Sequence, residues 1–369
     1  MENETKTVEK EATPAASGSK VWFYSKKVIR TLCFFLVIVI LLLCSGFALK
    51  PKNNSHKDGV IYELSWGFLA EPANSIDVFF AGNSDNFASF SPIEMWRAYG
   101  FQSYTSGFGR ERVMDVYYYL QDMLKTQHPK VVVLETDCIF YNIGRAEVIG
   151  GAVERMLYRY MPVFEYHDRW KDVKWEDMFR MPEYTWRSHT HGQRASAEVT
   201  PFEGERKIVP SDKVASIDKV SLFYLEAICK LCKDHDIDLV FAYVPCIKAW
   251  TYAKHNGIQK FADEHGIEFI DYNLMEKEIG LDWTNDTRDK GTHMNVYGAK
   301  KVSLHIGRYL ADKYQFKDLR SDAALSKSWA NDYQYYLKEI QESKNKPEVK
   351  DKSESKDTSG AQGKSESKK

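Results

Sequence analysis

The sequence predicts a doubly wound α/β fold, in which a parallel β-sheet carries helices on both of its faces. Two observations predict it. Short apolar runs rich in β-branched and aromatic residues alternate along the chain with longer segments of helical periodicity. Glycine and polar residues gather directly after several of the apolar runs. That is where the carboxyl ends of parallel strands place functional groups.

The predicted elements follow one another in a regular order. Ser91, Pro92 and Glu94 have the residue types of a helix start, Gly266 ends a later helix, and Asn295 is placed to cap the last one. Right-handed crossovers between successive strands then give a flavodoxin-like sheet. In chain order the strands are expected at 76–82, 101–105, 130–136, 238–245 and 267–272, and the helices at 91–100, 110–127, 214–235, 254–266 and 295–314.

One transmembrane helix is predicted before this domain, at residues 28–49. Residues 31–49 contain no charged side chain, close to the roughly 20 residues that cross a bilayer. A signal peptide would need a better cleavage site than "SGFALKPK", and a lipoprotein would need small residues before Cys44. Lys26, Lys27 and Arg30 directly precede the run. We therefore expect a single-pass membrane protein with residues 1–27 cytoplasmic and the large domain outside.

The rest of the chain divides into a folded domain and polar ends. Residues 1–27 and 342–369 are polar and poor in large apolar residues outside the start of the hydrophobic run, which predicts disordered tails. The domain is expected over residues 58–340. Residues 143–213 have a less regular pattern and are expected to be helices and a loop inserted on top of the sheet.

The predicted strand ends bring together the residue types of a serine hydrolase. Gly82, Asn83 and Ser84 follow the first strand. Ser84 is the candidate nucleophile, and its backbone N–H is a candidate oxyanion donor. His293 is the candidate base. Further polar groups at the same edge are Gly107, Gly109, Glu135, Asp137, Asp286 and Asp289.

With these residues in view, the chain resembles the SGNH (GDSL-like) hydrolases. "FFAGNSDN" stands at that family's serine block, "TSGFG" at its glycine block and "DKGTHMNVYGAKK" at its Asp–His block. The resemblance covers residues 74–143 and 236–312 and is closest to the membrane-anchored Gram-positive branch of D-alanine transfer (DltD-like) proteins. It implies Ser84, His293 and an aspartate as catalytic residues, with Gly107 and Gly109 as oxyanion donors beside Ser84.

Two positions depart from the family pattern. The asparagine block reads "LETD", so Asn142 or the side-chain amide of Asn83 would have to supply the third oxyanion donor. The position three before His293, where the family has aspartate, is lysine. Asp289 lies four before His293, and Gly291 would let the loop fold back; Asp286 is the less favoured alternative.

The resemblance implies an esterase or O-acyltransferase acting on acetyl or D-alanyl esters of a cell-envelope polysaccharide or teichoic acid. A membrane-bound O-acyltransferase (MBOAT) protein is the implied partner. No cofactor and no metal are expected, and a net charge of −1 argues against nucleic acid. The alternative is a catalytically inactive scaffold of the same fold.

Three other groups of residues have less specific interpretations. Cys229 and Cys232 are expected in a helix core, because no second cysteine pair accompanies them. "SHTHG" is expected to be an exposed loop, with metal binding by its two histidines as the alternative. Trp170, Trp175 and Trp186 are expected to pack structurally, with a glycan groove as the alternative.

Overall fold

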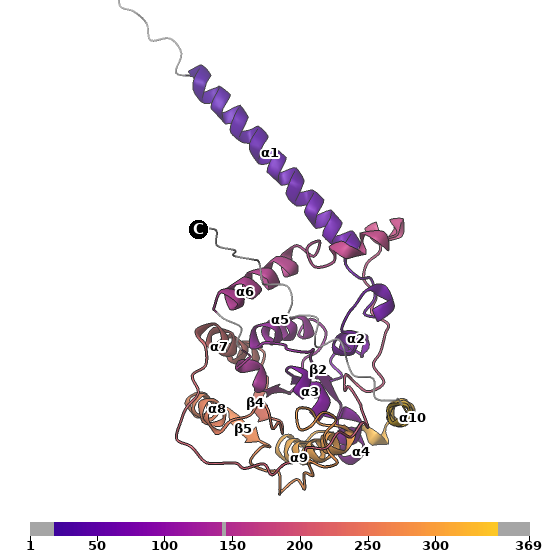
Figure 1. Cartoon of the computed structure of the whole chain (residues 1–369). Coiled ribbons are helices and arrows are strands. Elements are labelled where there is room, and N and C mark those ends of the chain that lie inside the picture. Colours follow the sequence, from indigo (N-terminus) through magenta and orange to yellow (C-terminus); the bar gives the residue numbers. More distant parts are fainter. Residues whose placement is uncertain (1–17, 142–144, 346–369) are drawn as a thin grey trace, which may run out of the picture. The chain divides into compact units, whose positions relative to one another are not determined.

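A computed structural model describes residues 18–141 and 145–345 (Figure 1). The chain forms two compact units. One contains the described part of 1–52 together with 153–181, and the other contains 53–152 together with the described part of 182–369.

The larger unit contains a five-stranded parallel sheet in the order β2-β1-β3-β4-β5, which confirms the predicted doubly wound fold. All four neighbouring pairs are parallel, and Val78 is in register with both Ser103 and Val131. The chain reverses its direction of growth across the sheet beside β1, and such a switch point is where α/β sheets bind ligands. The strands are β1 (Val78–Ala81), β2 (Ser103–Ser106), β3 (Val131–Glu135), β4 (Asp238–Tyr243) and β5 (Glu268–Asp271).

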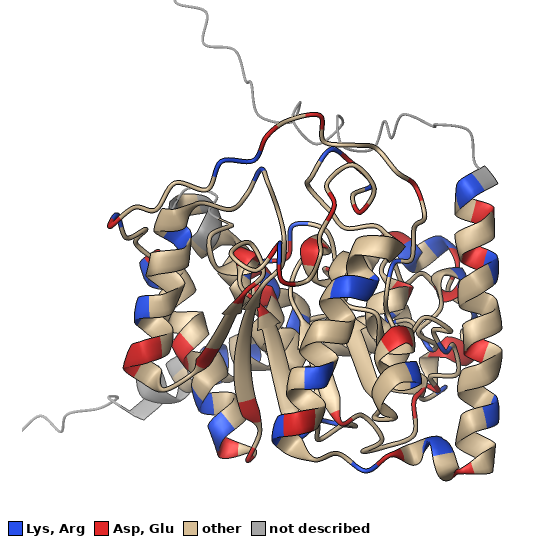
Figure 2. Ribbon diagram, turned by 90° about the horizontal axis from the view of Figure 1, so that it is seen from below, with Lys and Arg blue, Asp and Glu red and all other residues tan. Residues whose placement is uncertain are grey.

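Helices cover both faces of the sheet because side chains alternate along each strand. Phe79 and Val132 point into a core with α5 (Val113–Met123), α7 (Lys219–Asp234) and α8 (Tyr252–His265). Phe80 and Val133 point into a second core with α4 (Pro92–Tyr99) and α9 (Val296–Tyr314). Figure 2 shows Lys, Arg, Asp and Glu mainly on the helices and loops around the strands.

The predicted helix starts are confirmed at two positions. The Ser91 hydroxyl accepts a hydrogen bond from the Glu94 N–H, and Pro92 begins α4. The Asn295 side chain accepts hydrogen bonds from the N–H groups of Tyr297 and Gly298 and so caps α9. Cys229 and Cys232 lie on α7, where Cys232 is buried and Cys229 packs against the same core, as predicted.

Several elements were not predicted. The largest is α10 (Ala323–Asn345), which packs on α4 through stacked rings of Trp96 and Trp329 with centroids 4.6 Å apart. It continues past residue 340, where the domain was expected to end, and residues 346–369 lie outside the described part. The short elements of this unit are η1 (His56–Asp58), α2 (Glu63–Trp66), η2 (Gly67–Ala70), α3 (Ser84–Ser89), η3 (Asp137–Ile139) and η6 (Leu319–Ser321).

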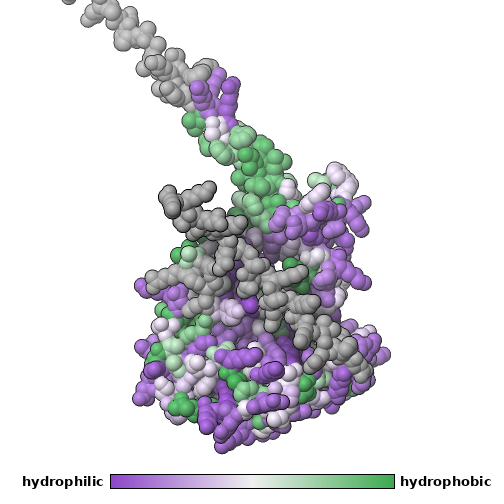
Figure 3. All heavy atoms as spheres, viewed as in Figure 1, coloured by the Kyte–Doolittle hydropathy of each residue, from purple (hydrophilic) through white to green (hydrophobic). Residues whose placement is uncertain are grey.

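The smaller unit is built on α1 (Gly18–Leu49). Residues 18–27, expected to belong to a disordered tail, are helical and continuous with the apolar run. Among the described residues one helix segment, Ser25–Leu49, is long and apolar enough to cross a membrane, a property that a signal sequence shares. Figure 3 shows its apolar part as a continuous green stretch.

The insertion expected over 143–213 contains α6 (Arg145–Tyr160), η4 (His167–Lys171) and η5 (Trp175–Met178). Its later part is irregular and belongs to the larger unit. There the Thr105 N–H donates to the His191 carbonyl, the Arg194 N–H to the Phe87 carbonyl and the Lys290 N–H to the Thr200 carbonyl. Residues 188–202 therefore run from β2 past α3 to the loop that precedes α9.

Candidate active site

Ser84 is the first residue of α3, directly beyond the end of β1. The Asn83 side-chain oxygen accepts a hydrogen bond of 2.9 Å from the Asp85 N–H, so Asn83 and not Ser84 caps the helix. The sequence indicated a helix only from Pro92 onward, because a six-residue helix is too short to show periodicity. The Ser84 hydroxyl is consequently available for contacts outside its own turn.

That hydroxyl is paired with His293. The distance from Ser84 Oγ to His293 Nε2 is 2.9 Å, within the range for a hydrogen bond between a nucleophile and its base. His293 lies two residues before the Asn295 cap of α9. The Thr287 hydroxyl donates to the His293 carbonyl at 3.0 Å, and Thr287 and Met294 form an antiparallel bridge. The helix start and the bridge together fix the backbone on both sides of the imidazole.

Asp289 holds the other side of the imidazole. Its Oδ2 is hydrogen-bonded to His293 Nδ1, and its Oδ1 accepts from the His293 N–H at 2.6 Å. Lys290 and Gly291 have φ values of 61° and 85°, and these left-handed residues fold the loop back. Burial alone would raise the pKa of Asp289, but the hydrogen bonds and charge of His293 hold it below its usual value.

Asp286 does not contact His293. Its carboxylate is fully buried and accepts from Lys301 Nζ at 2.6 Å and from the Asp282 N–H at 2.7 Å. Asp286 therefore ties the start of the loop to α9. Of the two aspartates that the sequence offered, the geometry brings Asp289 to the histidine.

The predicted oxyanion donors are only partly brought together. A Cβ on Gly107 would lie 2.1 Å from the Gly82 carbonyl oxygen, so Gly107 packs directly on the turn that leads to Ser84. Gly109 does not pack on this turn, because no atom lies within 4 Å of a Cβ placed on it. The Asn83 amide donates to Asp137 Oδ2 at 3.2 Å and is thus engaged elsewhere. Asn142 lies outside the described residues.

A group of buried carboxyl groups lies beside Ser84. Asp85 is 5% exposed, and its Oδ1 is 3.7 Å from His293 Nε2. Burial raises the pKa of Asp85 to about 7, although the nearby charge of His293 opposes the shift. Burial, with the charges of Asp137 and Asp85, also raises the pKa of Glu135 well above its usual range. The position of Asp85 next to the candidate nucleophile was the available signal, but sequence alone gives no measure of its burial.

Polar and cationic groups surround these carboxyl groups. Asp137 Oδ1 accepts from the Tyr243 hydroxyl at 2.9 Å and from Lys254 Nζ at 3.2 Å. Arg288, next to Asp289 in the chain, has its pKa lowered by burial and by the charge of Arg194, while Asp289 and Asp85 act in the opposite direction. The region thus combines both signs of charge within a largely buried setting.

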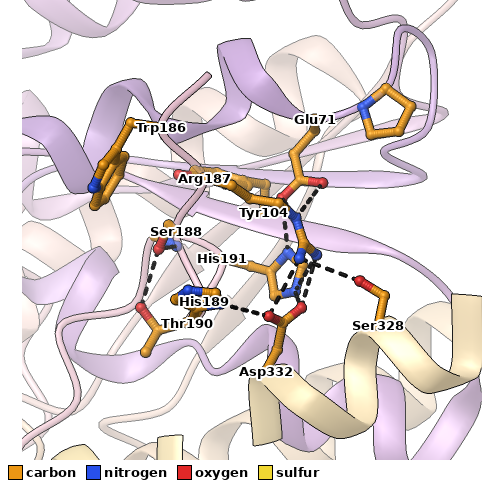
Figure 4. Close-up of polar contacts among 12 residues, drawn as sticks. Glu71, Tyr104, Trp186, Arg187, Ser188, His189, Thr190, His191, Ser328 and Asp332 are labelled. Carbon is orange, nitrogen blue, oxygen red and sulfur yellow. Dashed lines mark hydrogen bonds and ion pairs between the residues drawn. The ribbon is translucent and has the colours of Figure 1, made fainter. Parts of the chain in front are cut away.

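A second polar cluster lies away from the candidate nucleophile (Figure 4). His191 is buried, with Nδ1 3.2 Å from Glu71 and Nε2 3.2 Å from Asp332. Arg187 pairs with the same two carboxylates, at 3.2 and 2.7 Å respectively. The expectation of an exposed "SHTHG" loop is therefore wrong for His191, whereas His189 is partly exposed and hydrogen-bonded to Asp332 at 2.8 Å.

Burial opposes the charged form of His191, but Glu71 and Asp332 raise its pKa above the usual value. Burial would raise the pKa of Asp332, but the hydrogen bond and the charge of His191 hold the Asp332 pKa below its usual value.

The three tryptophans of this region were expected to pack structurally. This expectation is wrong for Trp170 and Trp175, which are exposed, whereas Trp186 is half-buried against Gly67.

No family model and no curated protein matches the chain. Among solved structures it is similar to a lipolytic protein of the G-D-S-L family from Desulfitobacterium hafniense DCB-2, with TM-score 0.35, 12% identity, and coverage of 64% of this chain and 99% of that one. An acylhydrolase from Bacteroides fragilis NCTC 9343 is similar with TM-score 0.36 and 11% identity, and the match covers 69% of this chain and 96% of that one. The acetylxylan esterase Axe2 from Geobacillus stearothermophilus is similar with TM-score 0.32 and 12% identity, and the match covers 68% of this chain and 98% of that one. Likeness at this level carries no weight for activity, so the chemistry rests on the residues of this chain.

Proposed function

We propose that the chain is a serine esterase or O-acyltransferase that works through an acyl-Ser84 intermediate. The observation that carries the proposal is the chain of contacts from Ser84 Oγ to His293 Nε2 at 2.9 Å and from His293 Nδ1 to Asp289. A nucleophile, a base and an acid that orients the base are the three parts this chemistry requires.

In the proposed reaction, Ser84 Oγ attacks the carbonyl carbon of an ester while its proton passes to Nε2 of His293. The backbone N–H groups of Ser84 and Gly107 are the candidate donors to the oxyanion that forms. Collapse breaks the bond to the leaving alcohol, which takes the proton from Nε2. Water or an acceptor hydroxyl then attacks the acyl carbon, gives its proton to Nε2 and releases Ser84.

Asp289 supports both halves of this cycle. Its hydrogen bond to Nδ1 selects the tautomer whose Nε2 can accept the serine proton. Its negative charge stabilises the imidazolium that results, and its lowered pKa keeps it ionised over the range in which the base must work. Asp289 Oδ1 also accepts a hydrogen bond from the His293 N–H, which keeps the imidazole in place between the two proton transfers.

The proposal extends to substrate and location through the resemblance of the sequence. We infer an anchored, extracytoplasmic enzyme of the DltD-like branch, whose substrates are acetyl or D-alanyl esters of a cell-envelope polysaccharide or teichoic acid. A membrane-bound O-acyltransferase is the proposed partner, because one candidate span in the described chain could not itself carry an activated acyl group across a bilayer.

A fluorophosphonate probe in detergent tests the chemistry directly. The full-length chain should be labelled covalently, Ser84→Ala should not be labelled, and His293→Ala should be labelled at least a hundredfold more slowly. Ser89→Ala is the matched control and should leave labelling unchanged, because Ser89 lies on the same helix and its buried hydroxyl has no hydrogen-bond partner in the described part of the chain. Absence of labelling in the natural chain would favour the alternative, an inactive scaffold protein.

The substrate is tested separately, by incubating enzyme that reacts with the fluorophosphonate probe with acetylated or D-alanylated envelope polymer. Release of acetate or D-alanine by the natural chain, and not by Ser84→Ala, would identify the acyl group. Transfer instead of hydrolysis would appear as esterified acceptor in place of free acid.

A further inference from the structure

The second half of α6 presents apolar side chains away from the protein. Val153, Met156, Leu157 and Tyr160 are all exposed, Tyr160 to 67%. Their spacing of i, i+3, i+4 and i+7 places them on one face of the helix. In a helix that packs on a protein core this face would be buried, so α6 has its apolar face uncovered within the described chain.

The turns after α6 continue this surface with large aromatic residues. Trp170 in η4 is 68% exposed, Trp175 in η5 is 72% exposed, and Phe179 just beyond η5 is 70% exposed. The Trp175 and Phe179 rings lie 5.6 Å apart. Exposure of this many large apolar side chains in one short segment is typical of an interaction surface. Tryptophan is also the residue most typical of the boundary between lipid tails and water.

The segment that carries these exposed side chains packs on the last turn of α1 through other residues, within the same compact unit. Gly46 lies against Pro162 and Val163, where a Cβ would come within 3.2 Å of either residue. The Arg169 guanidinium donates to the Leu49 carbonyl, and η4 and η5 both contact α1. The position of residues 153–181 along the α1 axis is therefore set by the end of the apolar run.

The length of the apolar run in α1 indicates how deep residues 153–181 would lie in a bilayer. The 19 uncharged residues 31–49 would span about 28 Å at 1.5 Å per residue, close to the roughly 30 Å hydrocarbon core of a bilayer. If α1 crosses the membrane, Leu49 lies at the outer boundary. Residues that pack on Gly46 and Leu49 then lie at the level of the headgroups.

We propose that residues 153–181, which we call the collar, insert their exposed apolar side chains into the outer boundary of the bilayer around α1. The collar contains six Lys or Arg and six Asp or Glu residues, so its partner is the apolar layer rather than anionic headgroups. Basic side chains such as Lys171, which lies 5.5 Å from the Trp170 ring, can extend to the phosphates while the rings stay below them.

The test uses the full-length chain in phosphatidylcholine vesicles whose acyl chains carry bromine, which quenches tryptophan emission on contact. The parent carries Trp22→Phe, because Trp22 lies on the other side of the apolar run in the sequence. We expect quenching in this parent, and at least a twofold smaller quenched fraction in the Trp170→Phe, Trp175→Phe double variant. Trp283→Phe, in the larger unit, is the control and should leave the quenched fraction unchanged. Adding anionic lipid or salt should change neither result.

Three outcomes would overturn the collar. Emission from Trp170 and Trp175 that is unquenched by brominated lipid places them in water. A photoreactive residue at position 170 that reacts in cells mainly with protein, instead of lipid, assigns the surface to a protein partner. Proteolytic removal of α1 from the mature chain would also remove the basis of the depth argument. Fluorophosphonate labelling in detergent depends on none of these, so the collar and the esterase proposal can fail independently.

Discussion

Ser84 Oγ and His293 Nε2 lie 2.9 Å apart although 209 positions separate the two residues in the sequence. Their meeting follows from the parallel sheet. Ser84 comes directly after β1 and His293 directly before α9, and α3 packs against α9. The Asn83 and Asn295 caps fix the two helix starts, so each side chain is placed by its own element.

Ser84→Ala should abolish ester turnover with little change in stability. The Ser84 hydroxyl contacts His293 but does not cap α3, so its removal should cost less than about 1 kcal/mol of unfolding free energy. Asn83→Ala, which removes the cap, should cost roughly 0.5–2 kcal/mol. Thermal unfolding of the two variants checks this ordering. A larger loss for Ser84→Ala than for Asn83→Ala would mean that the serine is structural.

Asp289→Asn and Asp286→Asn should separate activity from stability. The Asp289 amide would favour the wrong tautomer of His293 and should lower kcat by several orders of magnitude with modest loss of stability. Asp286→Asn should retain kcat while folded, but should lower the unfolding free energy by roughly 1.5–3 kcal/mol because the charge-assisted hydrogen bond from Lys301 is lost. Steady-state kinetics measures kcat, and urea unfolding measures the unfolding free energy, of both variants. A silent Asp289→Asn beside an inactive His293→Ala would rule out the orienting role.

Asp85 should make the protein less stable as pH rises. Its pKa is about 7 in the folded chain, against a usual value of 3.8, so the native state binds the proton more tightly. The unfolding free energy should therefore fall between about pH 4 and pH 7, by as much as about 4 kcal/mol from this group alone. The groups that act on Asp85 are His293, Asp137, Asp289 and Arg288, and Asp85 acts in turn on Glu135 and Cys246.

Asp85→Asn removes this titration while leaving the other carboxyl groups in place. Urea unfolding at pH 5, 6, 7 and 8 should give the variant a flatter pH dependence and a higher stability than the natural chain above pH 7. Equal slopes for the two proteins would show that Asp85 is ionised in the folded state throughout.

His191 should contribute stability that is lost in alkali. Its pKa is raised in the folded state, so the contribution is complete below the usual value of 6.5 and declines as pH rises through the higher folded value. His191→Gln removes one of the cationic partners of Glu71 and Asp332, which keep Arg187, and should cost roughly 1.5–3 kcal/mol at pH 6. The cost should shrink toward pH 9. His189→Gln, at a partly exposed site, is the control and should show a much smaller effect.

The sequence predicted the sheet well because its strands carry their own signal. Each of the five strands lies within two residues of its expected start, since buried apolar runs and the Ser91 and Asn295 caps are local features. The pairing of Ser84 with His293 was expected because two separate motifs matched one family pattern. Neither motif needed information from the 208 residues between Ser84 and His293.

What the sequence could not show depends on contacts between distant segments. His191 is buried because Asp332 lies 141 positions away on α10, a helix whose mostly polar sequence gave no strong periodicity. The charges that act on Asp85 come from Asp137 in η3 and from Arg288, Asp289 and His293 in the loop before α9. The exposure of Trp170 and Trp175 reversed the ordinary expectation that tryptophan packs inside, because no sequence pattern shows whether a face is covered.

The hydrogen bond from the Thr105 N–H to the His191 carbonyl has a consequence for solubility. β2 is an edge strand, and an open edge invites pairing with another chain. Residues around His191 occupy that edge, and a Cβ on Gly192 would come within 1.7 Å of the Thr105 carbonyl oxygen. Asp332 on α10 holds His191 in place, so loss of α10 should free the β2 edge. Truncation before residue 323 should therefore yield a protein that self-associates through β2, even though the candidate catalytic residues would all remain.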